Sequence, residues 1–480
     1  MAATTPEPSR VERTTCCIVG GGPAGLVLGL LLARAGVDVT VLEKHGDFLD
    51  DFRGDTVHPA TRDLLDDLGL GERFAKLPQS KVTEVVLPDA RGRTRRIGDF
   101  GALRRWGVRH PYVTIVPQWD LLTLFADAAR EEPGFRLCTG VTATSLLTED
   151  DRVTGVRHRT VNADGEFADG EIRADLTVAC DGRDSVLRAA SGLEVAESAV
   201  PFDTWWFRLS RRDGEQIGEL TRRPGRGRFA VVIPRESYFQ IGYVAPKGTD
   251  AQLRVRGIEA FRADVAELLP EYADRIGELV TMADVKHLDV RLDRLRRWHV
   301  EGLLCLGDAA HAMSPVGGMG INLAVQDAVA AARILAGPLR RGDVRGTDLD
   351  RVRRRRLLPT VLVQALQRVM HADLARSLRA GKSGGSAGPL LWAARWLPFV
   401  RLAATYLVGV GFRVERAPAF ARRSPGSGAT TGVPLVQEFN APPSRRGSAS
   451  APPVWDGSTG RWRVARSRCS AAASRGRRCP

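Results

Sequence analysis

The sequence predicts an α/β protein in which a mostly antiparallel β-sheet is inserted into a parallel-sheet domain, followed by helices and a disordered tail. Three observations support this fold class. A strand-like run at residues 15–19, a glycine loop, an apolar helical segment and a second run at 37–42 form one βαβ unit. Residues 202–244 contain three aromatic and β-branched runs that are typical of antiparallel strands. After residue 337 the chain becomes helical and arginine-rich.

The βαβ unit at the start of the chain carries a glycine fingerprint. Gly20, Gly22 and Gly25 occupy the glycine places of GxGxxG, and Glu43 follows the second strand eighteen residues after the last of them. The glycines permit a tight turn, close approach of a pyrophosphate and close helix packing, and Glu43 can accept a hydrogen bond from an adenosine ribose hydroxyl. The sequence therefore predicts a Rossmann-like dinucleotide-binding unit, without deciding between NAD and FAD.

A second strand and turn that could bind a ligand lie near residue 307. The apolar run at 303–306 predicts a short buried strand, Gly307-Asp308 breaks it, and the stretch 315–322 opens a helical segment. The Asp308 carboxylate is placed to accept a hydrogen bond from a sugar-like hydroxyl; the alternative is that it only caps the following turn. Glycines in the stretch let a planar ligand approach the backbone, with the positive end of the helix dipole facing it.

A third strand and turn complete the pattern. The apolar run at 176–180 predicts a buried strand that ends at Asp181-Gly182. With the glycine fingerprint before it and Gly307-Asp308 after it, the chain resembles the class A flavoprotein monooxygenases, the aromatic hydroxylase family typified by para-hydroxybenzoate hydroxylase. The resemblance covers roughly residues 14–415. It implies a Rossmann-like FAD-binding domain of the glutathione reductase type, an inserted substrate sheet and non-covalently bound FAD.

The resemblance also implies roles for individual residues. In the family, the glycine loop and its acid bind the ADP half of FAD, the Gly-Asp aspartate holds the ribityl chain, and the Asp-Gly motif is associated with the FAD pyrophosphate and the nicotinamide cofactor. A family arginine and a family glutamine near FAD also have counterparts here, for which a solvated loop residue and a helix-start residue are the alternatives. The implied cofactor-binding residues are Gly20, Gly22, Gly25, Glu43, Arg53, Gln118, Asp181, Gly307, Asp308, Gly320 and Asn322, with Arg183 as a further contact.

The turn at residues 315–322 is where the family places its chemistry. There, NAD(P)H reduces the flavin, dioxygen adds to form a C4a-hydroperoxide, and one oxygen atom passes to an electron-rich carbon. The resemblance implies the same reaction here, with NAD(P)H as a transient co-substrate. Because reduced flavin is anionic, we expect backbone N–H groups at this helix N-terminus to stabilise it. Pro315, Gly318 and Gly320 are the expected flavin and substrate turn, and no side chain is assigned as an acid or base.

Changes in composition and in residue pattern along the chain set the expected domain limits. The FAD-binding domain is assigned residues 14–75, 112–190 and 284–340, the substrate sheet 76–111 and 191–283, a C-terminal helical region 341–420, and a disordered tail 421–480. An amphipathic helix is expected at 257–269 after the last sheet strand.

Side chains on the expected substrate strands have two interpretations. Trp206, Arg208, Phe239 and Gln240 either line a substrate pocket or belong to an ordinary core. Two histidines next to motifs are expected to be structural: His58 packs a loop, and His311 supports the cofactor loop.

Composition narrows the class of protein. A chain of 480 residues with 43% hydrophobic residues can bury two or three domain cores, and its seven Cys show neither metal-ligand spacing nor a disulfide framework. Residues 421–480 contain eleven Arg, one Glu and one Asp, which is +9 of the net charge of +14. The tail is also rich in Ser, Gly, Pro and Ala, so its charge indicates a disordered basic extension rather than a nucleic-acid site. No apolar signal segment precedes residue 14, which favours a cytoplasmic chain with reduced thiols.

Other functions remain open at this point. The apolar stretch 390–412 is interrupted by Arg395, Pro398 and Arg401, which favours packed helices over a membrane span and leaves interfacial membrane contact as the minority interpretation. A related flavin reductase or halogenase is the second enzyme hypothesis, although no Trp-x-Trp-x-Ile-Pro string is present. A non-catalytic flavin-binding protein is the third. The substrate, the nicotinamide preference and the oligomeric state do not follow from the sequence.

Overall fold

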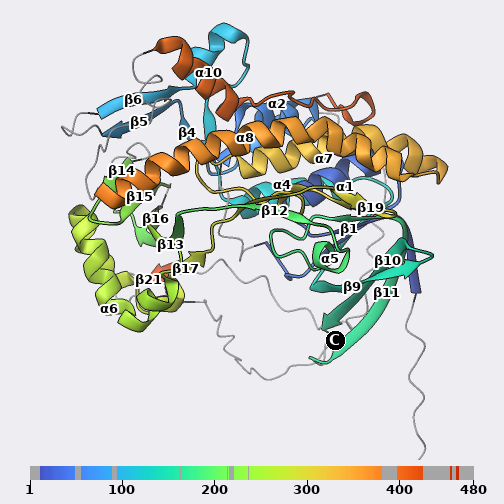
Figure 1. Cartoon of the computed structure of the whole chain (residues 1–480), viewed down its shortest axis with the longest axis horizontal. Helices are drawn as coiled ribbons and strands as arrows, with labels where there is room; N and C mark the ends of the chain where they lie inside the picture. Colours follow the sequence, from blue (N-terminus) through green and yellow to red (C-terminus); the bar gives the residue numbers. More distant parts are fainter. Residues whose placement is uncertain are drawn as a thin grey trace, which may run out of the picture.

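The computed structural model describes most of the chain. The described residues are 11–48, 56–88, 94–161, 165–212, 214–215, 221–235, 237–380, 397–424, 454–456 and 461–463. Arg53, which the sequence predicts to lie near the cofactor, falls outside them, as does most of the tail. Figure 1 shows a main lobe that contains the parallel sheet and, beside it, a second lobe formed by a smaller sheet and helix α6.

The main sheet is parallel at its centre, as the sequence predicts. Its order is β19-β20-β11-β1-β2-β8, and the pairs β20–β11, β11–β1, β1–β2 and β2–β8 are all parallel. The runs that form it are rich in Val, Ile, Leu and Cys with little alternation, because both of its faces are covered. Its strands are β1 (Val11–Val19), β2 (Val39–Glu43), β8 (Phe135–Thr139), β11 (Phe167–Ala179), β19 (His299–Val300) and β20 (Leu303–Cys305), with β9 (Val141–Glu149) and β10 (Arg152–Val161) attached antiparallel beside β11.

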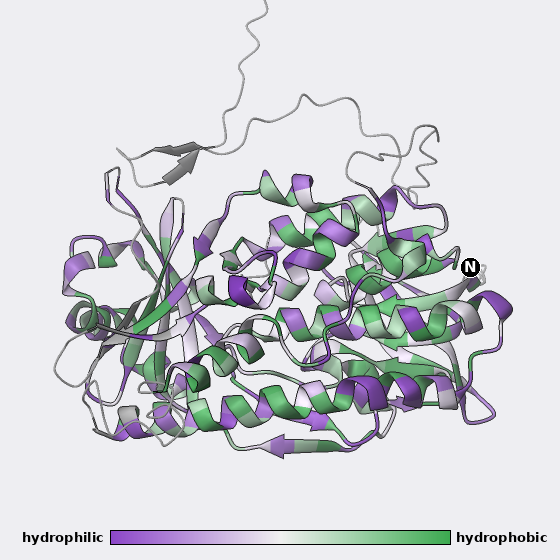
Figure 2. Ribbon diagram, turned by 90° about the horizontal axis from the view of Figure 1, so that it is seen from above, coloured by the Kyte–Doolittle hydropathy of each residue, from purple (hydrophilic) through white to green (hydrophobic). Residues whose placement is uncertain are grey.

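Helices cover this sheet, and the hydrophobic residues concentrate where helices and strands meet (Figure 2). Helix α1 is apolar on nearly all sides, because it is enclosed by the sheet, α4 and α7. Helix α8 lies along α7 and continues to the second lobe (Figure 1). The helices of the main lobe are α1 (Pro23–Arg34), α2 (Pro59–Asp67), α3 (Gly71–Ala75), α4 (Gln118–Arg130), α5 (Val186–Ala190), α7 (Gly320–Arg341) and α8 (Gly346–Ala380).

The second lobe is a five-stranded antiparallel sheet backed by one helix. Its order is β14 (Thr221–Pro224), β15 (Phe229–Pro234), β16 (Tyr238–Pro246), β13 (Phe202–Ser210) and β17 (Lys286–Leu288). Alternation places Trp205 and Phe207 against α6, while Phe202 and Trp206 face the main lobe. Helix α6 (Asp250–Leu268) begins seven residues before the expected start, and the expected start, Gly257, is a break in it (φ 80°, ψ 175°).

Several short strands form small sheets outside the two main ones. The described part of residues 76–111, which we grouped with the substrate sheet, contributes no strand to the five-stranded sheet. Instead β4 (Ser80–Val82) pairs with β7 (Val113–Ile115), which also pairs with β3 (Thr56–Val57). The remaining two-stranded pairs are β5 (Glu84–Pro88) with β6 (Thr94–Asp99) and β12 (Val195–Ser198) with β18 (Leu292–Leu295).

The chain after α10 (Pro398–Gly409) returns across the main lobe. Glu415 is buried and accepts hydrogen bonds from Arg355 at 2.5 and 2.9 Å. Ala421 is also buried, and its carbonyl accepts from Arg34 Nη1 at 2.9 Å. The expected start of the disordered tail at residue 421 is therefore too early, because residues 421–424 still contact the main lobe. Further on, the structure describes β21 (Val454–Asp456) paired with β22 (Arg461–Arg463). Among the described helices, none is long and apolar enough to span a membrane.

Candidate functional site

The sequence motifs meet at one edge of the main sheet. Gly20 follows β1, Glu43 ends β2, Asp181 follows β11, and Gly307 follows β20. Because these four strands are adjacent and parallel, their carboxyl ends lie side by side. Ligands of open parallel sheets bind at this edge. Strand order alone thus brings together residues as far apart in the sequence as Gly20 and Gly307.

The glycines of the fingerprint differ in what an added Cβ would meet. Gly20 has φ +109°, and an added Cβ there would lie 2.3 Å from the Cys180 carbonyl oxygen. A Cβ on Gly25 would lie 2.0 Å from the Gly20 carbonyl oxygen. A Cβ on Gly22 would meet no atom within 4 Å. Gly20 and Gly25 are therefore required by the protein itself, whereas Gly22 borders open space at the start of α1.

Glu43 is held at the end of β2 by neighbouring donors. Its Oε2 accepts from the Gly21 N–H at 2.7 Å, and its Oε1 accepts from the His45 N–H at 2.9 Å and faces His45 Nδ1 at 2.8 Å. The side chain is 10% exposed. A carboxylate offers about four lone-pair sites, so Glu43 keeps acceptor capacity for a further hydroxyl. His45 is a contact that the sequence interpretation did not include.

The Asp-Gly and Gly-Asp motifs are in contact. Arg183 Nη2 donates to Asp308 Oδ2 at 3.2 Å, and Arg183 Nη1 donates to the Asp289 carbonyl at 3.2 Å. Asp181 Oδ2 accepts weakly from the Leu187 N–H at 3.5 Å, while its Oδ1 is buried with no hydrogen-bond partner among the described residues. Burial raises the pKa of Asp181. The Asp181 backbone N lies beside the Gly20 turn, 2.9 Å from an added Cβ on Gly20, so the unsatisfied oxygen belongs to a residue at this turn.

The turn before α7 is the fourth part of the site. Gly317 and Gly318 have φ of +84° and +62°, and the Gly318 N–H donates to the Pro315 carbonyl at 3.0 Å. Helix α7 begins at Gly320, so the first N–H groups of this helix have no intrahelical partner. An added Cβ on Gly320 would touch only Met313 Cβ, at 3.7 Å. The turn thus presents backbone donors and little side-chain bulk.

Comparison with known families decides the identity of this arrangement. Residues 13–365 match a family model described as an FAD binding domain. The chain belongs to the class A flavoprotein monooxygenases. Among curated relatives, 6-methylpretetramide 4-monooxygenase of Streptomyces rimosus is 35% identical over 352 residues, which is 73% of this chain and 81% of that protein. Protoasukamycin 4-monooxygenase of Streptomyces nodosus subsp. asukaensis is 28% identical over 360 residues, covering 74% and 87%.

A solved structure supports the fold. The anhydrotetracycline hydroxylase from Streptomyces rimosus has a TM-score of 0.65 and 23% identity, covering 83% of this chain and 76% of that one. The prediction of an FAD-dependent monooxygenase from three ordered motifs is confirmed at the level of the family. The roles of individual cofactor-binding residues do not follow from family membership and are argued from the geometry.

The residues present fit FAD. Open space at Gly22 faces the N-terminus of α1, as a pyrophosphate site requires. Glu43 and the partly exposed Asp308 offer carboxylate oxygens toward hydroxyl groups, and Asp181 has a buried oxygen without a donor. This flavoprotein monooxygenase therefore has acceptors for the sugar-like parts of FAD and backbone N–H groups for its anionic parts.

Other predicted residues of the flavoprotein have mixed placements. Gln118 is the first residue of α4 and is buried. The Arg208 guanidinium lies over Trp119 and Tyr238, at 5.3 and 4.8 Å from the ring centroids, and so bridges the two lobes. Phe239 packs in the core beside α6, on the opposite face of the sheet from Trp206. Of the two interpretations given for Phe239, the structure supports the ordinary core, because strand alternation separates it from the face that carries Trp206.

The two histidines both contact motif elements. His311 Nε2 lies 2.5 Å from Asp327 Oδ2, and Asp327 Oδ1 accepts from Arg356 Nε at 2.8 Å, all within the interior. His311 is a structural partner of α7 and α8, in line with the sequence interpretation. His58 does more than pack a loop, because its Nε2 lies 2.9 Å from the Gly318 carbonyl oxygen.

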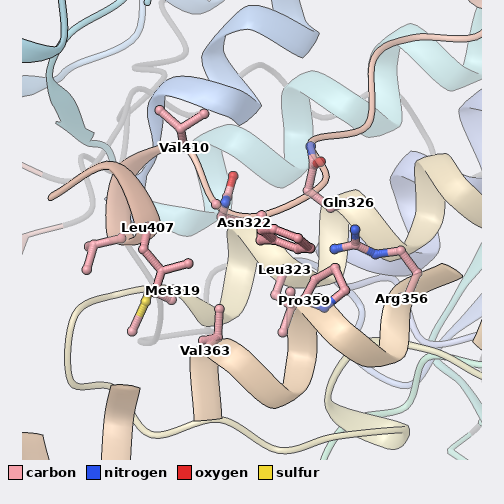
Figure 3. Close-up of a pocket in the computed structure, with 12 residues that line it drawn as sticks. Met319, Asn322, Leu323, Gln326, Arg356, Pro359, Val363, Leu407 and Val410 are labelled. Carbon is pink, nitrogen blue, oxygen red and sulfur yellow. The ribbon is translucent and has the colours of Figure 1, made fainter. Parts of the chain in front are cut away.

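Two hollows border the described chain, one against the turn before α7 and one away from the motifs. One is a cavity of about 20 Å³ between α7, α8 and the chain after α10, with Asn322, Gln326 and Arg356 on one side and apolar residues such as Leu407 and Val363 on the other (Figure 3). It has room for about one water molecule and is too small for an aromatic substrate. The other is an open groove of about 840 Å³ at the amino ends of the sheet strands, on the edge opposite the motifs.

Proposed function

We propose that this flavoprotein consumes NAD(P)H and dioxygen to hydroxylate a hydrophobic, aromatic or polyketide-like small molecule. The observation that carries the proposal is the meeting of Gly22, Glu43, Asp181 and Asp308 at one sheet edge, with the turn before α7 nearby. The names of two curated relatives support the substrate class, since they name 6-methylpretetramide and protoasukamycin as the compounds acted on.

The chain's own residues divide the binding work. Gly22 and Glu43 would hold the ADP half of FAD, and Asp181 and Asp308 would hold its pyrophosphate and ribityl part. When bound, FAD supplies the redox chemistry, taking electrons from the nicotinamide and activating dioxygen. The N–H groups at the start of α7 would stabilise negative charge on the reduced ring system, because oriented donors in a water-poor site need little reorganisation.

The apolar junction between the two lobes is the proposed substrate wall. Trp206 and Val231 of the second sheet are half-buried and pack in one cluster with Val316 and Met319 of the turn and Leu366 of α8. The Trp206 ring lies over Gly242, where an added Cβ would come within 2.9 Å of it, so this glycine is needed for the ring position. Apolar walls of this kind suit an aromatic ligand, which aromatic side chains contact at low entropic cost.

Steady-state oxidation of NADH and NADPH, measured with and without polycyclic aromatic candidates, tests the proposal. Under ¹⁸O₂, we expect a product heavier by one ¹⁸O atom. Nicotinamide oxidation without oxygen incorporation would indicate a reductase, a halide-dependent halogenated product a halogenase, and bound FAD without turnover a flavin-binding protein. Each of these results would overturn the hydroxylase assignment.

A further inference from the structure

Three side chains of one short segment hold the turn before α7. Thr56 Oγ1 donates to the Gly318 carbonyl oxygen at 2.9 Å, and His58 Nε2 lies 2.9 Å from the same oxygen. Thr61 Oγ1 donates to Asn322 Oδ1 at 2.6 Å. The segment and the turn are about 260 residues apart in the sequence. We call Thr56, His58 and Thr61 the carbonyl clamp.

Local structure explains why these three side chains face the turn. Thr56 lies in β3 and His58 two residues later, still in extended conformation (φ −82°, ψ 162°), so both side chains point to the same side. Thr61 is the third residue of α2, which begins directly after His58 at Pro59. The change from strand to helix thus brings all three toward α7.

The hydrogen bond to the Gly318 carbonyl indicates which ring nitrogen of His58 carries the proton. A carbonyl oxygen only accepts, so Nε2 must carry the proton. The ring is 1% exposed, and its Nδ1 makes no hydrogen bond within the described part of the chain. Burial lowers the pKa of His58 to about 4, although the Gly318 and Val408 carbonyls oppose this. His58 is therefore neutral at neutral pH, with its Nε2–H donating to the Gly318 carbonyl.

The clamp restricts one peptide plane. Glycine lacks a Cβ, so the peptide between Gly318 and Met319 has little steric barrier to a flip. In a trans peptide the C=O and N–H point in opposite directions. Two donors on the Gly318 oxygen hold it toward β3 and so turn the Met319 N–H away from β3. A flipped peptide would leave the buried His58 donor and the partly buried Thr56 donor without this partner.

We propose that the carbonyl clamp positions the backbone N–H donors of the turn for the reduced flavin, and prevents the Gly318 carbonyl from facing it. This inference rests on the proposed function, because it assumes that the flavin ring lies at the start of α7. Thr56 and His58 are positioning residues, since they act through the backbone. Their effect must be larger on reduced FAD, which carries the negative charge, than on oxidised FAD.

The test compares both redox states of bound FAD. In Thr56→Val and His58→Met, we expect affinity for oxidised FAD to change less than about 3-fold, and affinity for reduced FAD to fall about 10-fold further. For a two-electron couple this lowers the midpoint potential by about 30 mV. Thr56→Ser and His58→Gln, which keep a donor, should restore the potential. The measurements are FAD titration by fluorescence and equilibrium redox titration, and neither needs substrate.

His371→Met is the matched control. His371 is 3% exposed, and neither of its ring nitrogens has a hydrogen-bond partner among the described residues, so the variant also removes a buried imidazole but no contact to the turn. Its potential should equal that of the unmodified protein. The proposal is overturned if the clamp variants leave the potential unchanged or if the control shifts it equally. If His58→Met does not fold, the nearly isosteric Thr56→Val decides. Failure to hydroxylate any substrate would overturn the proposed function and leave these redox results standing.

Discussion

Arg183 Nη2 donates to Asp308 Oδ2 at 3.2 Å, and so joins the Asp-Gly and Gly-Asp motifs across 125 residues of sequence. The Asp308 side chain remains 32% exposed, which leaves oxygen lone pairs for a ligand. Arg183 also donates from Nη1 to the Asp289 carbonyl, next to the second lobe. A ligand held by Asp308 is therefore coupled to the junction between the lobes as well as to the main sheet.

Asp308→Ala should weaken FAD binding with little effect on folding. Losing a hydrogen bond to a charged acceptor costs about 1.5–3 kcal/mol, which corresponds to roughly 10- to 150-fold in Kd. Asp169→Ala is the control, because Asp169 also pairs with an arginine, Arg159, but lies exposed on β11 far from the motifs. Equal FAD affinity of the two variants, measured by titration, would show that Asp308 does not contact the cofactor.

Substitutions at two glycines of the fingerprint should affect FAD binding and folding separately. Gly22→Ala places its methyl in open space, so we expect a normally folded protein with weakened FAD binding, because the methyl would occupy the pyrophosphate approach. Gly25→Ala would put Cβ 2.0 Å from the Gly20 carbonyl oxygen and should lower the melting temperature of the FAD-free protein. Full FAD affinity in Gly22→Ala would contradict the proposed pyrophosphate position.

A pair of truncations tests the end of the folded domain. Removal of residues 425–480 should leave the melting temperature nearly unchanged, as the composition of the tail predicts. Removal from residue 421 onward also takes away the Ala421 carbonyl that accepts from Arg34 and the Arg423 guanidinium that lies 3.6 Å from Glu132. That second truncation should cost about 1–3 kcal/mol of stability. Equal melting temperatures would mean that these contacts contribute nothing.

Local sequence signals predicted the fold well where local rules decide it. The βαβ unit and the strands β13, β15 and β16 lie within a few residues of their expected places, because apolar alternation and glycine turns are local features. Ala421 was placed in the tail because composition cannot reveal that Arg34 needs its carbonyl. The sequence left Phe239 open between a pocket and the core, because the identities of neighbouring strand residues do not reveal which face of the sheet is covered; the structure places it in the core.

The candidate site was predictable only in part, for a similar reason. Gly22, Glu43 and Asp308 belong to short motifs with fixed spacing, so the sequence indicates them directly. Thr56 and His58 carry no such signal, because their partner is a carbonyl oxygen about 260 residues away. Residues that act through the backbone of a distant turn can be identified only when the two segments are seen together.

Stability should fall as the pH drops from about 6.5 to 4. Burial lowers the pKa of His371 to about 4 from the ordinary value of 6.5. Between these values the unfolded chain binds a proton that the folded chain does not, so the free energy of unfolding rises with pH and is lost on acidification. The contribution of one such histidine is roughly 3 kcal/mol at most. In urea titrations, His371→Met should show a shallower decline over this range; an unchanged decline would contradict the lowered pKa.

The turn before α7 gives the most direct test of where the flavin ring lies. Gly318 is unsuitable, because its φ of +62° and the nearness of Thr56 Oγ1, 2.3 Å from an added Cβ, would disturb the turn with or without FAD. Gly320 has room, since its Cβ would touch only Met313, so Gly320→Leu should retain the fold. If the flavin ring lies at this turn, the leucine crowds it and misaligns the N–H donors. Flavin reduction and substrate hydroxylation should then fall on the order of 100-fold or more, beyond any loss in FAD affinity. Stopped-flow reduction and reoxidation of the FAD-loaded variant measure this, and rates equal to those of the unmodified protein would place the reacting ring elsewhere.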